Sequence, residues 1–259
     1  TDISQLLDND SINTVVIATQ HNLHAEQVIS SLNARKNVFV EKPLALSHLE
    51  LDSIEQAYNA QDGKCRVMVG YNRRFAPHVV KMKSLLANVI EPKAFIMTMN
   101  AGAIPADHWT QDPSVGGGRV IGEACHYIDL MRFLADSEIV DFNATCMGAA
   151  RGVDVTEDKA AITLTFKDGS FGTIHYLANG GKAFAKERIE VFANNGVLQL
   201  DNFRKLTGYD WPGFKKDKLM SQDKGQGACS KAFISAINSG IESPISFYEI
   251  MEVARISID

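Results

Sequence analysis

The chain has 259 residues, a formal net charge of -5 and 45% hydrophobic residues, which is an ordinary composition for one large or two smaller globular domains. The mild acidity, without a basic stripe, argues against a nucleic-acid partner. No apolar run reaches the roughly 18 residues of a membrane span, and the chain does not open on a signal peptide. The four cysteines are scattered without a CxxC pair, so we expect reduced thiols, a cytoplasmic location and no metal site.

The first part of the chain alternates strands and helices. After a short helix over 2–9, the pattern predicts strands and helices in turn, at 14–19, 23–35, 38–40, 47–61 and 66–70. Thr14 to Thr19 is almost continuously apolar, which is typical of a strand buried on both faces. Ser47 and Glu50 have the spacing of a capping box at the start of the second long helix.

Strands joined through helices in this way are parallel. Residues 1–75 are therefore predicted to form the C-terminal half of a Rossmann nucleotide-binding domain. Polar residues follow each strand and would share the carboxyl edge of the sheet, where open α/β folds bind ligands. A G-x-G-x-x-G turn does not precede these strands, and Gly116-Gly117-Gly118 lacks the strand that should come before it. We therefore expect the chain to start partway through the domain.

Residues 76–259 have the pattern of an α+β domain with a large, mostly antiparallel sheet. Helices are predicted at 78–86, 119–135, 228–238 and from 246 onward, and long loops at 101–118 and 208–227. Strands are predicted at 93–100, 140–147, 160–166, 171–176, 187–193 and 197–200. Glycine-containing turns at 167–170 and 194–196 indicate hairpins. The fold class is α/β followed by α+β.

Glu41-Lys42-Pro43 directly follows the strand at 38–40. Pro43 favours an extended backbone at Lys42, which makes the direction of the lysine side chain reproducible. Lys42 is therefore a candidate to donate a proton or a charge-assisted hydrogen bond to a substrate oxygen. The alternative is an ordinary solvated Glu-Lys pair.

The helix at 119–135 carries a second group of candidates. His126 is the acid/base candidate, because imidazole titrates near neutral pH. Asp129, Glu123 and Arg119 lie on the same or a neighbouring stripe of the helix. A histidine satisfied by packing and ordinary helix acids are the alternatives. Arg73 and Arg74 suit anionic groups, although exposed arginines are usually solvated.

Three motifs in this order resemble the Gfo/Idh/MocA family of NAD(P)-dependent sugar oxidoreductases. Val16-Ile17-Ala18-Thr19 followed by His24 is similar to the family's strand and ATPxxxH turn, with Gln20 where proline is usual. Glu41-Lys42-Pro43 matches the EKP signature. Gly116 through His126 to Asp129 is similar to the GGG…D…H..D segment. The resemblance covers nearly the whole chain.

The resemblance implies that Lys42 and His126 are the catalytic pair. Many members have an aspartate four residues before the histidine, but here that position is Gly122 and the acid is Glu123. On a helix this moves the carboxylate by about 100°, so either Glu123 takes over the role or Lys42 and His126 act alone. The implied NAD or NADP contacts come from Ala18, Thr19, Gln20, His24, Glu41 and Lys42. The implied substrate contacts come from Asn72, Arg73, Arg74, Arg119 and Asp129.

The residues from Gly70 to Pro77 and from Arg119 to His126 are similar to a branch of two-domain proteins in which an alcohol-dehydrogenase-like region precedes the Gfo/Idh part. That branch is often linked to surface polysaccharide synthesis. By this analogy the substrate is a sugar or nucleotide-sugar. In the family that the chain resembles, the open face of the large sheet commonly pairs with a second subunit, so we expect a homodimer or larger homo-oligomer. Because helix N-terminal N–H groups normally hold the pyrophosphate, we expect this chain alone to bind NAD(P) weakly or not at all. A non-catalytic sugar-binding or assembly module is one alternative function. Another is a hydrolase or epimerase that uses Glu123 and His126 without a nicotinamide.

Overall fold

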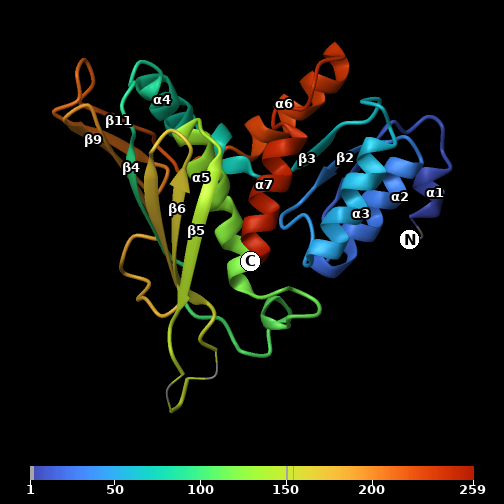
Figure 1. The fold of residues 1–259 in the computed structure, drawn as a ribbon, viewed down its shortest axis with the longest axis horizontal. Coiled ribbons are helices and arrows are strands. Elements are labelled where there is room, and N and C mark those ends of the chain that lie inside the picture. Colours follow the sequence, from blue (N-terminus) through green and yellow to red (C-terminus); the bar gives the residue numbers. More distant parts are fainter. Residues whose placement is uncertain (1–2, 150, 154) are drawn as a thin grey trace. The chain divides into compact units, whose positions relative to one another are not determined.

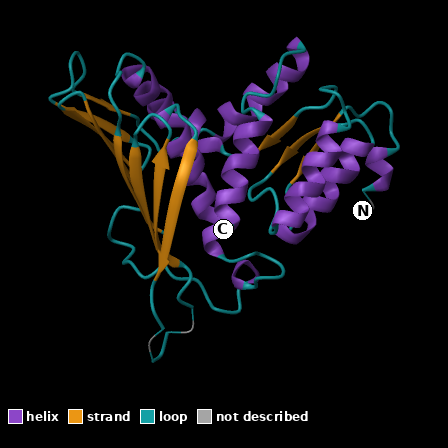
Figure 2. Cartoon of the chain, in the orientation of Figure 1, coloured by secondary structure: helices purple, strands orange, loops and turns teal. Residues whose placement is uncertain are grey.

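The structure is a computed structural model that describes residues 3–149, 151–153 and 155–259. The chain divides into two compact units. Unit 1 comprises Thr1–Tyr71, Trp109–Cys125 and Gly227–Asp259, and unit 2 comprises Asn72–His108 and His126–Gln226. The boundary expected at residue 75 is four residues from the first break, but unit 1 also contains two later segments. Figures 1 and 2 show the elements of each unit.

Unit 1 is built on a parallel three-stranded sheet in the order β1 (Thr14–Ile17), β2 (Asn37–Val40), β3 (Val67–Val69). Helix α2 (His24–Asn33) crosses from β1 to β2 and packs on both strands. The three strands therefore form the predicted parallel unit. The expectation that β1 is buried on both faces is wrong, because Val16 is 67% exposed. Only the face with Val15 and Ile17 is covered.

The helices of unit 1 pack on one another and on the sheet. The predicted capping box is present at the start of α3 (His48–Asn59), which lies beside α2 (Figure 1). Helix α7 (Phe247–Ile258) contacts both α3 and β3, with the rings of Tyr58 and Phe247 stacked 3.7 Å apart. Two further helices are α1 (Ser4–Leu7), whose predicted first residue Asp2 lies outside the described part, and α6 (Gln226–Ser239).

Unit 2 contains an eight-stranded sheet in the order β11-β10-β9-β8-β4-β7-β6-β5. The strands are β4 (Ala94–Asn100), β5 (Ile139–Cys146), β6 (Lys159–Phe166), β7 (Phe171–Leu177), β8 (Glu187–Ala193), β9 (Gly196–Asp201), β10 (Lys205–Tyr209) and β11 (Lys216–Lys218). Strand β4 is inserted between β7 and β8 and runs parallel to β7, so the sheet is mixed and not a simple meander. Strands β10 and β11 were not predicted, because they are short and mostly polar.

Helices α4 (Pro77–Leu86) and α5 (Cys125–Ala135) belong to the layer beside this sheet. The part of α5 from His126 onward lies along one face of the sheet (Figure 1), and Met131 packs so closely on β7 that a Cβ at Gly172 would be 2.6 Å from its sulfur. The opposite face carries exposed apolar side chains from four strands: Ile96, Phe171, Phe192 and Tyr209.

The predicted helix at 119–135 has an irregular start. Val120–Ala124 forms a π-helix that leads into α5. Short 3-10 helices lie at His21–Leu23, Asn72–Phe75 and Trp109–Gln111.

Among the described residues, no helix has the length and hydrophobicity that a membrane span requires. In the same ranges, no three His, Cys, Asp or Glu residues are grouped as a metal site requires.

Candidate active site

In unit 1, hydrogen bonds continue beyond the strands at the carboxyl edge of the sheet. Glu41 N–H donates to Ile17 O, and Gly70 N–H donates to Val40 O, each over 2.8 Å. The predicted cofactor-side residues after β1 are exposed: Ala18, Thr19 and Gln20. Glu41 is exposed as well, and the absence of a side chain at Gly70 leaves room for its carboxylate. The edge therefore presents a polar, accessible surface.

His24 is fully buried beneath this edge. Its Nδ1 donates to Pro43 O over 2.7 Å, and its Nε2 lies 3.2 Å from Thr19 O. Both partners are carbonyl oxygens, which only accept hydrogen bonds, so the shorter contact is a hydrogen bond donated from Nδ1–H. His24 thus connects the turn after β1 to the loop that follows Lys42.

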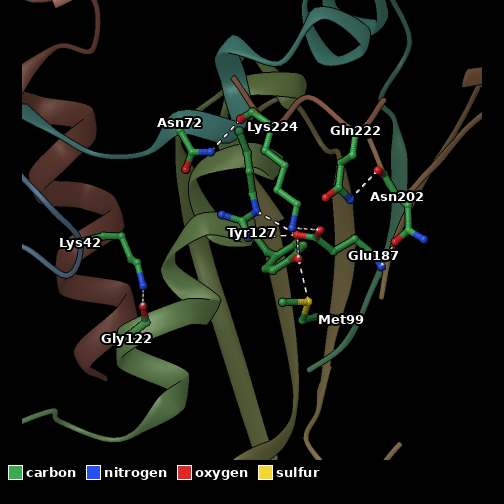
Figure 3. Close-up of polar contacts among 10 residues, drawn as sticks. Lys42, Asn72, Met99, Gly122, Tyr127, Glu187, Asn202, Gln222 and Lys224 are labelled. Carbon is green, nitrogen blue, oxygen red and sulfur yellow. Dashed lines mark hydrogen bonds and ion pairs between the residues drawn. The ribbon is translucent and has the colours of Figure 1, made fainter. Parts of the chain in front are cut away.

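Lys42 is half-buried at the end of β2, and the Lys42-Pro43 peptide bond is cis. Its Nζ donates to Gly122 O over 2.7 Å (Figure 3). An ammonium has three N–H donors. One carbonyl therefore fixes the direction of the side chain and leaves donors for another oxygen. The acceptor belongs to the π-helix, an irregularity that is frequent at functional sites.

His21 also lies in this group, although no motif in the sequence marks it as a site residue. It is 8% exposed, and its Nδ1 donates to Gly116 O over 2.8 Å. Its ring centroid is 4.8 Å from that of Trp109, in an edge-on arrangement, and 5.6 Å from that of His24. The available signal was its position three residues before His24, but a lone histidine at a helix start carries little information without its partners.

Three predicted residues lie in the helical segment around Gly122. Arg119 is 6% exposed and Glu123 is half-buried, both in unit 1. His126 is 5% exposed and is the second residue of α5, in unit 2. The backbone is helical from 119 to 126. Gly122, whose carbonyl accepts a hydrogen bond from Lys42, therefore lies four residues before His126 in one continuous helical segment.

The predicted substrate-side residue Arg73 belongs to a buried network in unit 2, in which Figure 3 labels Tyr127, Glu187 and Lys224. Its Nε and Nη2 donate to Glu187 Oε1 over 3.2 and 2.9 Å. Tyr127 OH donates to the same oxygen over 2.7 Å, and Lys224 Nζ pairs with Oε2. Asn72, which is 8% exposed, donates from Nδ2 to Lys224 O over 2.7 Å. No local pattern in the sequence indicated Glu187, Tyr127 or Lys224 as partners of Arg73.

The network shifts the pKa values of Glu187 and Tyr127. Burial raises the pKa of the Glu187 carboxyl, but the charges of Arg73 and Lys224 and the hydrogen bonds from Lys224 and Tyr127 together outweigh burial and leave the pKa below its ordinary value. Burial and the Glu187 charge hold the pKa of Tyr127 well above its ordinary value. Tyr127 is therefore a protonated donor, and Glu187 is an anion shared by two cations.

Arg74 and Asp129, both predicted to contact substrate, bind each other. Arg74 Nε donates to Asp129 Oδ2 over 3.1 Å, and its Nη2 pairs with Oδ1. Both side chains are buried, and the guanidinium carbon lies 5.0 Å from the centre of the Phe133 ring. The ion pair links the turn after β3 to α5.

Two family profiles match the chain. The profile described as "Oxidoreductase family, NAD-binding Rossmann fold" matches residues 1–71, and the profile described as "GFO/IDH/MocA C-terminal domain" matches residues 91–199. The chain belongs to the Gfo/Idh/MocA oxidoreductase family. The resemblance drawn from the three motifs is thus confirmed.

Curated relatives of this family are similar over most of the chain. Myo-inositol 2-dehydrogenase from Thermotoga maritima is 28% identical over 211 residues, which cover 80% of this chain and 61% of the relative. 4-Carboxy-2-hydroxymuconate-6-semialdehyde dehydrogenase from Sphingobium is 29% identical over 278 residues, covering 99% of this chain and 80% of the relative. The chain spans about 60% of the length of the Thermotoga relative and of an uncharacterized Bacillus subtilis oxidoreductase.

Solved structures of the family share the fold. An oxidoreductase domain protein from Kribbella flavida superposes with a TM-score of 0.84 at 24% identity, covering 99% of this chain and 79% of the other. Levoglucosan dehydrogenase in complex with NADH and levoglucosan superposes with a TM-score of 0.85 at 22% identity, with the same coverage. The predicted fold class, a Rossmann-type parallel sheet followed by a large sheet domain, is confirmed.

Proposed function

We propose that this chain provides the lysine and histidine of an NAD(P)-dependent oxidoreductase acting on a hydroxyl or carbonyl of a sugar or nucleotide-sugar. The observation that carries the proposal is the position of Lys42, whose ammonium is fixed by Gly122 O over 2.7 Å at the carboxyl end of β2. Relatives named for inositol and levoglucosan dehydrogenation support a polyol or sugar substrate.

We propose that the exposed edge of unit 1 receives the nicotinamide end of the cofactor. The turn over Ala18 to Gln20 and the Glu41 carboxylate are accessible, and His24 contacts the carbonyl oxygens of Thr19 and Pro43. The cofactor supplies the hydride acceptor or donor. We propose that these residues and Lys42 hold the cofactor. Activity measured with NADH and with NADPH shows which of the two the protein uses. Weak NAD(P) binding by this chain alone stays a prediction, which calorimetric titration with NADH and NADPH tests.

The proton that accompanies hydride transfer is assigned to the side chains of this chain. Lys42 donates a charge-assisted hydrogen bond to the reacting oxygen, which stabilises negative charge as it develops there. His126 accepts the hydroxyl proton during oxidation and returns it during reduction, because an imidazole exchanges protons near neutral pH. Glu123 stays a candidate to assist this exchange.

The remaining predicted residues are proposed to shape the substrate side. The guanidinium groups of Arg73 and Arg74 are each bound to a carboxylate, so we assign them and Asp129 to orienting the site. Direct substrate contact is proposed for Asn72 and Arg119. The link to surface polysaccharide synthesis and the cytoplasmic location both stay predictions.

We also propose that the protein is a homo-oligomer that pairs through the outward face of the unit 2 sheet. Strand register places Ile96, Phe171, Phe192 and Tyr209 on this one face, and each side chain is 39–54% exposed. Exposed apolar groups on a common face are typical of protein interfaces.

Lys42→Ala and His126→Ala in the intact protein test the catalytic assignment. Each change should lower kcat with NADH or NADPH and a panel of sugars by at least about 100-fold, the usual contribution of a positioned proton-transfer group. Lys64→Ala, at an exposed lysine of unit 1, is the matched control and should retain activity. Unfolding temperatures show whether each variant is folded.

Two results would contradict the assignment. Sugar binding without redox turnover in the wild type would favour a non-catalytic module. Hydrolysis or epimerisation without a nicotinamide would favour an enzyme that uses Glu123 and His126.

A further inference from the structure

The side chain of His21 contacts Gly116 and Gly122, the two ends of the segment 116–122. The last carbonyl of this segment accepts a hydrogen bond from Lys42. Its Nδ1 donates to Gly116 O over 2.8 Å. A Cβ added to Gly122 would lie 3.1 Å from its Cε1 and 3.6 Å from its Nδ1. The ring therefore packs directly on the Cα of Gly122, the residue whose carbonyl accepts from the Lys42 ammonium.

The segment from 116 to 122 has few side chains of its own to set its conformation. Gly117 and Gly118 have φ values of +73° and +85°, in a region that glycine adopts without steric cost. Gly122 has no side chain to pack. The position of its carbonyl therefore depends on neighbouring residues.

The turn after β1 supplies those neighbours. Asn22 N–H donates to Val115 O over 3.1 Å, just before the glycines. The His21 ring meets Gly116 and Gly122 and is itself held edge-on against Trp109. The imidazole is the side chain through which this turn reaches both ends of the segment.

The surroundings favour a neutral His21. Burial lowers its pKa, the hydrogen bond to Gly116 opposes this effect, and the positive charge of Lys42 lowers the pKa further. His24 and Glu123 also face the ring, with opposite and smaller effects. A neutral ring that donates from Nδ1 carries no charge to repel the nearby ammonium.

We propose that His21 is a positioning residue for Lys42, which holds the 116–122 segment so that Gly122 O keeps the ammonium in place. The inference rests on the proposed role of Lys42 in the reaction, but the contact itself can be measured without turnover. It also explains why position 122 carries no side chain, since one would compete with the ring for space.

Competitive acetylation of the chain with acetic anhydride, read by mass spectrometry, measures the reactivity of each lysine. His21→Leu should raise the acetylation of Lys42 relative to the exposed Lys64 by about fivefold, the effect expected when one hydrogen bond is lost. His21→Asn retains a side-chain N–H near the place of Nδ1 and should stay within about twofold of the wild type on the same scale. Asn22→Ala, at the exposed neighbour that uses only its backbone, is the matched control.

The inference is wrong if Lys42 in His21→Leu reacts as in the wild type. Equal increases of Lys42 acetylation in His21→Leu and His21→Asn would also overturn it, because the side-chain N–H at position 21 would then not hold Gly116 O. If His21→Leu does not fold, Gly122→Ala takes its place. The added methyl group must displace the ring by a few tenths of an ångström and should increase Lys42 acetylation, and an unchanged value in the folded variant would reject the inference.

Kinetics of the intact protein separate this inference from the proposed function. His21→Leu should lower kcat more than it changes KM, and His21→Asn should restore most of kcat. Full activity of Lys42→Ala would reject the catalytic role of the lysine and leave the acetylation result standing. Unchanged acetylation in His21→Leu, with loss of activity in Lys42→Ala, would reject only the positioning role.

Discussion

Glu187 is fully buried and receives hydrogen bonds or ion pairs from Arg73, Lys224 and Tyr127. Two cations share one carboxylate, so the group keeps a net positive charge inside unit 2. Removing water from charges is costly unless each is paired. The carboxylate is therefore required wherever the two cations are retained.

Glu187→Gln should lower the free energy of unfolding by about 3–5 kcal/mol, the usual cost of breaking a buried ion pair. The folded-state pKa of Glu187 is below its ordinary value, so its stabilisation is complete above that ordinary value and is lost as pH falls through the lowered one. Wild-type stability should therefore decrease in acid more steeply than that of the variant. Urea unfolding at several pH values measures both.

Glu190→Gln, on the same strand, is the matched control. Its carboxylate pairs with Arg188, which is 43% exposed, and a pair of this kind contributes at most about 1 kcal/mol. Equal losses of stability in the two variants would show that the Glu187 network does not act as a buried pair.

At the scale of elements, α3 stabilises the loop that carries Lys42. The helix begins five residues after Pro43, and its capping box joins the Ser47 side chain to Glu50 N–H over 3.3 Å. The Glu50 carboxylate in turn accepts from the backbone N–H groups of Leu46 and Ser47 over 2.8 and 3.1 Å. The helix start is thereby connected to the end of the loop.

Ser47→Ala should destabilise the chain by about 1 kcal/mol, because it removes one half of the box. Ser53→Ala, in the middle of the same helix, should change stability by less, since its hydroxyl only donates to Leu49 O within the helix. Thermal unfolding of the two variants provides the comparison. A larger effect at Ser53 would mean that the cap does not limit the stability of α3.

Elements with a strong period were predictable, and irregular ones were not. The parallel strands, the α3 cap and most of the long strands of unit 2 follow from local patterns of apolar residues. The π-helix at Val120–Ala124 does not, because a shift from i+4 to i+5 bonding leaves no clear pattern in five residues. Strands β10 and β11 have too few apolar residues to show an alternation.

At the scale of the whole molecule, the outward face of the unit 2 sheet is the proposed contact between copies. Phe171→Lys places a charge among its exposed apolar groups and should shift the protein from dimer or larger oligomer to monomer in sedimentation velocity experiments. Leu49→Lys, at an 80% exposed position on α3, is the control and should leave the oligomer intact. A wild-type protein that sediments as a monomer would contradict the proposal.

The sequence by itself determined the fold class, the family and the location of Lys42 at the end of a parallel strand. These features depend on residues that are close together in the chain, such as an apolar strand followed by Glu41-Lys42-Pro43. Only the tertiary structure decided which groups meet, because Gly122 is 80 residues from Lys42, Gly116 is 95 from His21 and Glu187 is 114 from Arg73. Spacing along the chain carries no information on such contacts, since the packing of helices and strands sets them.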